Sequence, residues 1–233
     1  MQEDKLFTDN IDFDIPCWYD NPPGCPNKGH RCKWRCVPYK CMNALINNCG
    51  QPNAFKFLIK LVPPRKDVKS FLRLNSIKDD IVNWVNNSSN IFIHSKNNYN
   101  GKTTWALKLL YKYFDQVWMY KPFTIMGYYL YIPEFLFKLR DLKYKDTKEF
   151  KQIDYILKHC PLVIWDSINT VKLTPNDQVA LDIYLNKRGL NGCSNIFVGK
   201  TQTQEEGIDT LGILYDKLNS VENIEFLAGS YNR

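Results

Sequence analysis

The stretch of residues 91–104 constrains the fold of this chain more than any other part of the sequence. It reads Ile-Phe-Ile-His-Ser-Lys-Asn-Asn-Tyr-Asn-Gly-Lys-Thr-Thr. The apolar run, the polar loop ending in Gly-Lys-Thr and the apolar-periodic segment behind it predict a strand, a phosphate-binding loop and a helix. Backbone N–H groups of such a loop and the N-terminus of the helix favour an anionic phosphate. The sequence therefore predicts a nucleotide site; the alternative is an ordinary strand–turn–helix that contains Gly-Lys-Thr.

The loop also indicates which groups contact the nucleotide. Lys102 would reach the β- and γ-phosphates, and the hydroxyl of Thr103 would bind Mg²⁺. The usual pattern has Gly six residues before the lysine, where this chain has Lys96. Asparagine tolerates positive φ better than most residues, so we expect Asn97, Asn98 and Asn100 to supply the left-handed turns. The loop residues predicted to bind the nucleotide are Asn98, Asn100, Gly101, Lys102, Thr103 and Thr104.

A second apolar run provides the other half of a nucleotide site. Residues 162–165 are apolar and end in Asp166, which predicts a carboxylate for Mg²⁺ at the end of a buried strand; the alternative is a plain strand terminus. The next position, where an acid commonly orients the attacking water, holds Ser167. ATP binding is therefore better supported than rapid hydrolysis. Further on, Lys200 or Thr201 would contact the γ-phosphate, unless they only form a polar strand end.

Strand-like and helix-like segments alternate from residue 90 onward. The strand-like segments are 91–94, 124–131, 162–165, 195–198 and 223–227, and the helical ones are roughly 102–113, 133–142, 147–159 and 175–185. Alternation of this kind, with near-continuously apolar strands, predicts a parallel five-stranded sheet covered by helices on both faces. The predicted fold class is therefore α/β with three layers.

The eight cysteines are unevenly distributed, with six of them between residues 17 and 49. In a reducing cytoplasm, clustered cysteines predict metal ligands more readily than disulfides. The predicted ligands of a structural zinc ion are Cys17, Cys25, Cys32 and Cys36, with His30 as a substitute for one of them. The alternative is a set of free or disulfide-bonded thiols. Cys41 and Cys49 are weaker candidates, and Cys160 and Cys193 are expected to be buried apolar residues.

These segments divide the chain into three parts. Residues 1–60 form a Cys-rich module whose helix, Tyr39 to Asn47, has an apolar face for the zinc site and a partner. Residues 61–88 form a Pro-containing linker and a lead-in helix, and residues 89–233 form the nucleotide-binding domain. The sequence has neither an apolar run of 18 residues nor an apolar region behind its charged N-terminus, so we expect no membrane span, no signal peptide and a cytoplasmic location.

The formal net charge of +7 permits contact with nucleic acid without establishing it. The basic stretch 138–151 contains Tyr144 and Phe150 between its lysines and arginine. Such interleaving is typical of a surface that tracks a single strand and stacks its bases. Acidic residues interrupt the stretch, and an ordinary charged helix face is the alternative.

Together these motifs resemble a known family. The order Ser-Lys…Asn-Gly-Lys-Thr-Thr-Trp-Ala-Leu-Lys, Leu-Val-Ile-Trp-Asp and Asn-Gly-Cys-Ser-Asn-Ile-Phe-Val-Gly resembles phage relatives of the DnaC/DnaI-type replicative helicase loaders, which are AAA+ ATPases. The Cys cluster with residues 39–45 resembles the zinc-bearing module of such loaders. The resemblance implies an AAA+ fold, with ATP, Mg²⁺ and Zn²⁺ as cofactors. It implies a hexameric replicative helicase and single-stranded DNA as partners in a bacterial host cell, with self-association on the helicase.

The resemblance also assigns roles to residues. Lys102 and Thr103 would be the phosphate and Mg²⁺ residues, and Asp166 the Walker B acid. The family's trans-acting arginine would correspond to Lys217, which lacks the forked contact of a guanidinium. Arg188 is a spare candidate for that cation, or a surface residue. The chain ends soon after the fifth predicted strand, so we expect no C-terminal lid.

Three functions agree with these motifs. The first is an ATP-binding loader that docks on the helicase through residues 1–60 and delivers it to single-stranded DNA in phage replication. The second is a weakly or non-hydrolysing AAA+ module that captures or inhibits a host helicase or its loader, which the residues at positions 167 and 217 favour. The third is a transposition-helper ATPase, against which the zinc-like module argues.

Overall fold

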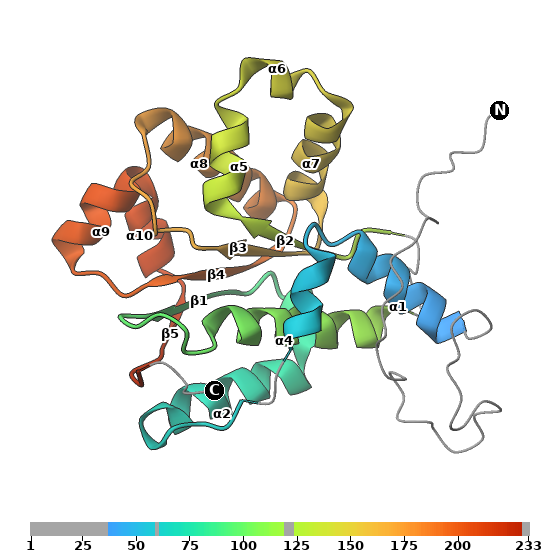
Figure 1. Cartoon of the computed structure of the whole chain (residues 1–233), viewed down its shortest axis with the longest axis vertical. Helices are drawn as coiled ribbons and strands as arrows, with labels where there is room; N and C mark the ends of the chain where they lie inside the picture. The colour runs from blue at the N-terminus through green and yellow to red at the C-terminus, as the bar shows by residue number, and fades with distance from the viewer. Residues whose placement is uncertain (1–36, 59–60, 119–123, 230–233) are drawn as a thin grey trace.

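A five-stranded parallel sheet forms the centre of the molecule. The computed structural model describes residues 37–58, 61–118 and 124–229 (Figure 1). The strands follow the order β2-β3-β4-β1-β5, and every neighbouring pair is parallel. Their bounds are β1 (Asn90–Ser95), β2 (Gly127–Tyr131), β3 (Leu162–Asp166), β4 (Ser194–Lys200) and β5 (Glu222–Glu225). The predicted α/β fold with a parallel five-stranded sheet is confirmed.

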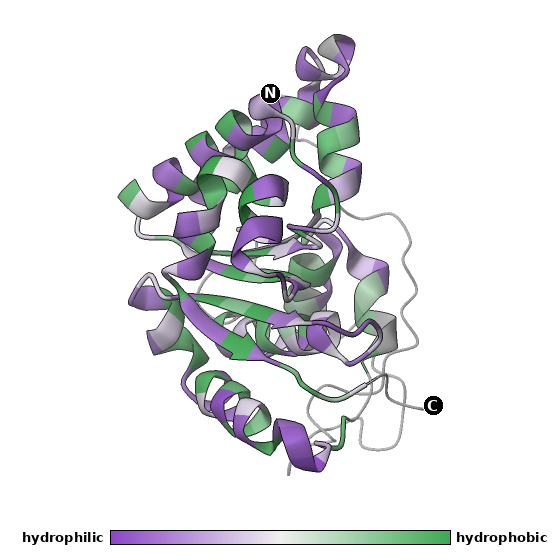
Figure 2. Cartoon of the chain, turned by 90° about the vertical axis from the view of Figure 1, so that its left-hand side faces the viewer, coloured by the Kyte–Doolittle hydropathy of each residue, from purple (hydrophilic) through white to green (hydrophobic). Residues whose placement is uncertain are grey.

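Helices cover both faces of this sheet (Figure 1). On one face lie α1 (Val37–Asn47), η1 (Pro52–Phe57), η2 (Arg65–Asp67), α2 (Val68–Asp79), α3 (Ile81–Asn86) and α4 (Lys102–Val117). The opposite side carries α5 (Ile132–Leu139), α6 (Leu142–Lys145), α7 (Lys148–His159), α8 (Pro175–Leu190), α9 (Gln204–Leu211), η3 (Gly212–Leu214) and α10 (Tyr215–Asn219). Most helices carry both green and purple segments in Figure 2, as expected for elements that bury one face.

The two-residue period of the strands divides the core into two layers. Ile91 and Ile93 of β1 pack on the α4 side, whereas Phe92 between them packs on the α8 side. All three are less than 9% exposed. Successive side chains of a strand point to opposite faces, so a strand covered on both faces is apolar throughout. This is why near-continuously apolar segments predicted buried strands.

Helix α1 packs in the same hydrophobic core as α4. Met42, Leu45 and Ile46 are at most 2% exposed and pack in one cluster with the buried residues of α4. The expectation that this helix offers an apolar face to a partner is therefore wrong. The helix is amphipathic, as predicted, but its apolar face packs against the other helices on this side of the sheet.

The loop after α1 extends the contact to the edge of the sheet. The backbone N–H of Tyr129 in edge strand β2 donates to the carbonyl of Cys49 at 2.6 Å. The next residue, Gly50, has φ +89°, and a Cβ there would lie 2.6 Å from the Tyr129 carbonyl oxygen. Only glycine allows this close approach at that dihedral. Residues 37–58 are thus fixed to β2 by packing and by a backbone hydrogen bond.

The other edge strand is held by the segment that precedes the sheet. Asp67, fully buried, accepts hydrogen bonds from the backbone N–H groups of Leu227 and Ala228 at 2.7 and 3.2 Å. Arg73 of α2 makes two hydrogen bonds to Glu222 of β5, at 2.5 and 2.8 Å. The residues predicted as linker and lead-in helix therefore cover the free edge of β5, which would otherwise expose unpaired backbone groups. Among the helices of the described segments, none is long and apolar enough to cross a membrane.

We predict that Ile46→Ala lowers the free energy of unfolding of the whole α/β unit by about 2–5 kcal/mol, because it opens a cavity in the shared core. Denaturant unfolding followed by tryptophan fluorescence measures this. Ile183→Ala on α8 is the matched control, since Ile183 is 55% exposed and the change should stay within about 0.5 kcal/mol. An unchanged transition in Ile46→Ala would mean that α1 folds apart from the sheet.

Candidate functional site

A cleft of about 830 Å³ lies at the carboxyl ends of the strands. In open parallel sheets this is where ligands bind. The predicted residues that line it are Asn98, Asn100, Gly101, Lys102, Thr103, Thr104, Asp166 and Lys200. Leu61, Tyr99, Tyr131, Ser167, Thr170, Val198 and Gly199 complete the lining. The fold therefore brings together the predicted nucleotide contacts except Lys217 and Thr201, the alternative to Lys200.

The P-loop is organised around a buried asparagine. Asn100 is fully buried, and its amide N–H donates to the hydroxyl oxygen of Ser95 at the end of β1. The same oxygen accepts the backbone N–H of Asn97 at 3.1 Å. The carbonyl oxygen of the Asn100 side chain accepts from Lys102 at 3.0 Å. Asn100 thus ties the loop to the strand before it and to the lysine after it, and sequence reasoning missed this role.

Lys102 bonds to acceptors of its own loop. Its ammonium donates to the Asn97 carbonyl at 2.7 Å as well as to Asn100. Burial lowers the pKa of Lys102 to about 8, and the nearby Asp166 carboxylate partly opposes this shift. A partly desolvated ammonium held by neutral oxygens favours an anion that would take their place. The environment of Lys102 therefore fits a phosphate group.

The left-handed turns of the loop are not made by asparagines, so that prediction is wrong. The loop residues with positive φ are Tyr99, at 57°, and Gly101, at 86°. A non-glycine residue in this region costs roughly 1–2 kcal/mol. Tyr99 is 87% exposed, so few contacts of its ring offset that cost. The strain at Tyr99 is a property of the loop that asparagine statistics could not reveal.

Asp166 meets the P-loop helix at the end of β3. Its carboxylate is 5% exposed and accepts a hydrogen bond from the Thr103 hydroxyl at 3.1 Å. A second bond to the same oxygen comes from the phenol of Tyr129 on β2. Burial raises the pKa of Asp166, and both hydroxyl donors act against that rise. A carboxylate beside a hydroxyl is an oxygen donor set of the kind that Mg²⁺ prefers, so these residues fit the predicted ion.

The end of β4 is fixed by Asn169, which follows β3. Its side-chain oxygen accepts the backbone N–H of Lys200 at 2.8 Å, and its amide donates to the Lys200 carbonyl at 2.8 Å. A Cβ on Gly199 would lie 2.3 Å from the Asn169 oxygen, so glycine is required there. Lys200 lines the cleft, whereas Thr201 bonds to His94 and Glu225 at 2.8 and 3.0 Å. The geometry thus favours Lys200 over Thr201 as the contact to a nucleotide.

Ser167 lies in the cleft with an unusual backbone. It has φ 61°, and among the described residues that line the cleft Asp166 is the sole carboxylate. A serine hydroxyl is a poor general base compared with a carboxylate. The residue after Asp166 thus supplies a hydroxyl where an acid commonly orients the attacking water, and it does so from a left-handed backbone conformation.

Two predicted cations lie elsewhere. Lys217 of α10 is bound to Asp182 and, at 2.6 Å, to Asn186 of α8. Arg188 is fully buried, so neither the trans-acting role nor the surface position expected for it is correct. Its guanidinium donates to the carbonyls of Leu157, Cys160 and Ser194 and to the side chain of Asn195, at 2.5–3.0 Å. Arg188 joins α7, α8 and β4 inside the protein.

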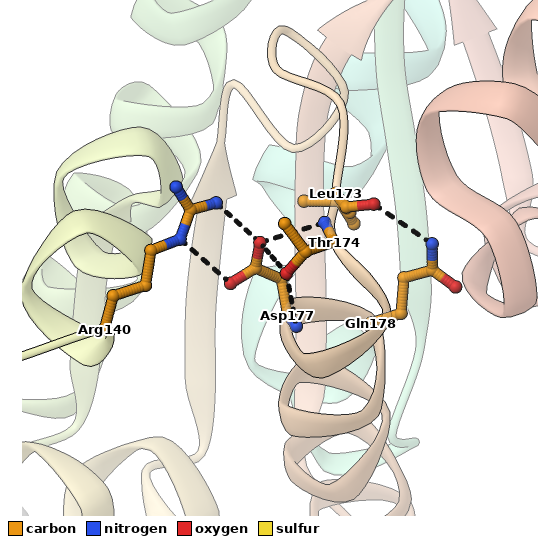
Figure 3. A network of polar contacts seen from close by, with 5 residues as sticks. All are labelled: Arg140, Leu173, Thr174, Asp177 and Gln178. Atoms are coloured by element: carbon orange, nitrogen blue, oxygen red, sulfur yellow. Dashed lines mark hydrogen bonds and ion pairs between the residues drawn. The ribbon is translucent and has the colours of Figure 1, made fainter. Parts of the chain in front are cut away.

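The basic stretch 138–151 is partly paired with acids. Arg140 donates to the buried Asp177 at 2.6 Å, and Asp177 also caps the N-terminus of α8 through Thr174 (Figure 3). Lys138 pairs with Glu134 at 3.1 Å. These pairs reduce the positive charge available to a phosphate backbone at this place. For Lys138 and Arg140, these pairs favour an ordinary charged helix face over a surface that binds single-stranded DNA.

The predicted zinc ligands Cys17, Cys25, Cys32 and Cys36, and His30 with them, lie outside the described residues. Within the described part of the chain no group of three His, Cys, Asp or Glu could hold a metal ion. Cys160 and Cys193 are buried free thiols, as expected, and so are Cys41 and Cys49. Burial raises the pKa of Cys49 to about 12, which disfavours the thiolate that zinc requires.

We predict that Tyr99→Asn raises the free energy of unfolding by about 1 kcal/mol, because asparagine adopts the left-handed conformation at lower cost. Thermal or denaturant unfolding measures the change. Tyr155→Asn, at a 65% exposed position of α7, is the matched control and should give no stabilisation. A less stable Tyr99→Asn variant would show that the exposed ring contributes more than its backbone costs.

The architecture is shared with proteins of DNA replication. A crystal structure of the DnaC helicase loader superposes with a TM-score of 0.54 at 12% identity, covering 80% of this chain and 98% of that one. A crystal structure of DnaI superposes with a TM-score of 0.53 at 12% identity, covering 77% of this chain and 92% of DnaI. The replication initiator DnaA, bound to AMPPCP and single-stranded DNA, gives 0.55 at 12% identity, over 74% of this chain and 49% of DnaA.

No protein-family model matches the sequence, and no curated protein matches it significantly. The similarity is therefore one of fold, and at this level it confirms the resemblance to the DnaC/DnaI-type loaders. The chain has the three-layer α/β fold of DnaC, DnaI and DnaA.

Proposed function

We propose that this chain is an ATP- and Mg²⁺-binding AAA+ protein of DNA replication that loads a hexameric replicative helicase onto single-stranded DNA. The observation that carries the proposal is the meeting of Lys102, Thr103 and Asp166 in one cleft. These are the three groups that the phosphate-loop chemistry requires. The fold shared with the DnaC helicase loader, and with a DnaA that holds AMPPCP and single-stranded DNA, supports the same function.

The cleft indicates how the nucleotide would be held. Lys102 would exchange its bonds to Asn97 and Asn100 for the β- and γ-phosphates. Thr103 and Asp166 would hold Mg²⁺, which neutralises phosphate charge when bound. Lys200, fixed by Asn169, would contact the γ-phosphate from the neighbouring strand. Lys102, Thr103, Asp166 and Lys200 all line this one cleft, which supports their joint contact with a single nucleotide.

A second function is favoured because Asp166 is the sole carboxylate among the described residues that line the cleft. With Ser167 beside Asp166, and with Lys217 bonded to Asp182 and Asn186, both groups that usually promote hydrolysis are replaced or occupied. The same chain could then act as a weakly or non-hydrolysing module that captures a host helicase or its loader. ATP-dependent gain of loading, against loss of unwinding with or without ATP, distinguishes the two functions.

Helicase docking falls, in this proposal, to the Cys-rich segment that precedes α1. The apolar residues of α1 are used in the core, so the docking surface would be formed by residues 1–36 around a zinc ion. Short segments of this kind fold when a metal binds. Self-association would follow on the helicase.

We predict one zinc ion per chain, held by Cys17, Cys25, Cys32 and Cys36. Elemental analysis of freshly purified, reduced full-length protein measures it, and simultaneous Cys25→Ser and Cys32→Ser substitution should remove the metal. The double substitution Cys160→Ser and Cys193→Ser changes buried thiols outside the cluster and should keep it. Metal-free wild-type protein would refute the zinc proposal and leave the nucleotide site unaffected.

We predict that Lys102→Ala weakens binding of a fluorescent ATP analogue about 100-fold, because charge-assisted bonds worth about 3 kcal/mol are lost. Lys112→Ala is the control: Lys112 lies on the same helix, paired with Asp115 at 2.8 Å. In a loading assay on circular single-stranded DNA with bacterial replicative helicases, wild type with ATP should increase bound helicase, and Lys102→Ala should not. Equal nucleotide affinity of Lys102→Ala and wild type would contradict the site assignment.

A further inference from the structure

The Walker B position of this chain has an aromatic neighbour that does not line the cleft. Tyr129 lies on β2, the edge strand paired with β3, and its phenol donates to the same Asp166 oxygen that accepts from Thr103. Tyr129 is 8% exposed and Asp166 5%. The phenol therefore reaches the carboxylate from inside the core, behind the surface that a nucleotide would contact.

Three donors hold the Asp166 carboxylate: the hydroxyls of Thr103 and Tyr129 and the backbone N–H of Ser167. Thr103 would itself bind the cation, and Ser167 follows Asp166 directly in the chain. Tyr129 alone comes from another strand. It can thus fix the orientation of the carboxylate independently of the P-loop.

The position of Tyr129 is itself set by the N-terminal part of the fold. Its backbone N–H is bonded to the carbonyl of Cys49 at 2.6 Å, and Gly50 packs against its carbonyl. These contacts hold the backbone of Tyr129, and burial of its side chain at 8% exposure restricts the phenol. Groups that hydrogen-bond to a metal-binding carboxylate orient it, and their loss typically weakens metal binding 10–100-fold.

We propose that Tyr129 is a positioning residue that orients Asp166 for Mg²⁺, and so sets the Mg²⁺ concentration at which this chain binds nucleotide tightly. The proposal rests on the proposed nucleotide site. Without the phenol, Asp166 keeps its bond to Thr103 but loses the donor that comes from the neighbouring strand, and so gains rotational freedom. The variant should therefore lose affinity for the cation and keep its affinity for the Mg²⁺-free nucleotide.

The test is a Mg²⁺ titration of fluorescent ATP-analogue binding to the full chain carrying Tyr129→Phe. We expect the Mg²⁺ midpoint to rise about tenfold, with Mg²⁺-free affinity unchanged, which also shows that the variant is folded. Tyr128→Phe is the matched control, since Tyr128 is equally buried on the same strand but packs in the opposite core layer. Its midpoint should equal that of the wild type.

A double-mutant cycle shows whether Tyr129 acts through Asp166. In an Asp166→Asn background, Tyr129→Phe should cause no further shift of the Mg²⁺ midpoint. An unchanged or lowered midpoint in Tyr129→Phe alone, or an equal shift in both backgrounds, would overturn the positioning role while the nucleotide site stands. Failure of the wild type to bind the analogue at any Mg²⁺ concentration would instead overturn the proposed function, and the positioning role with it.

Discussion

The hydrogen bond from Thr103 to the buried Asp166 carboxylate is the contact on which the site depends. It joins the first turn of α4 to the end of β3, across 63 positions of sequence. A carboxylate at 5% exposure is expensive to desolvate unless donors satisfy it, and Thr103 and Tyr129 both do so. The same bond places a hydroxyl and a carboxylate side by side. The Thr103–Asp166 contact thus stabilises the buried carboxylate and also brings together two oxygen groups that suit a divalent cation.

The surrounding structure keeps that arrangement in place. Asn100 fixes the loop to β1, and Asn169 fixes the end of β4 to the segment after β3. On the other side, the loop after α1 bonds to β2 and sets the strand that carries Tyr129. The cleft is therefore supported by contacts that extend from the loop after the first described helix to the end of β4. A separately packed N-terminal helix would not give this support.

The alternation of apolar strand-like and helix-like segments and the order of the motifs were sufficient to predict the sheet and most of the cleft. Buried parallel strands are apolar, and the glycine–lysine–threonine sequence follows one of them, so the sequence alone predicts that Lys102, Thr103 and Asp166 lie together. The sequence did not predict which side chains form hydrogen bonds with distant parts of the chain. Arg188 looked like a surface cation because nothing in the sequence reveals the backbone carbonyls that surround it. Tyr129 lies within the predicted strand 124–131, where nothing in the sequence marks its bond to Asp166. Tyr99 has a φ value that its residue type disfavours.

The central claim is that this cleft binds Mg²⁺–nucleotide through Lys102, Thr103 and Asp166. An experimental structure of the full chain with a non-hydrolysable ATP analogue and Mg²⁺ tests it most directly. We expect the Lys102 ammonium to leave the Asn97 carbonyl for the β- and γ-phosphates in that structure. We also expect the cation to lie between the Thr103 hydroxyl, the Asp166 carboxylate and the phosphates. Phosphates bound elsewhere, or a Lys102 still bonded to its own loop beside an occupied cleft, would contradict the central claim.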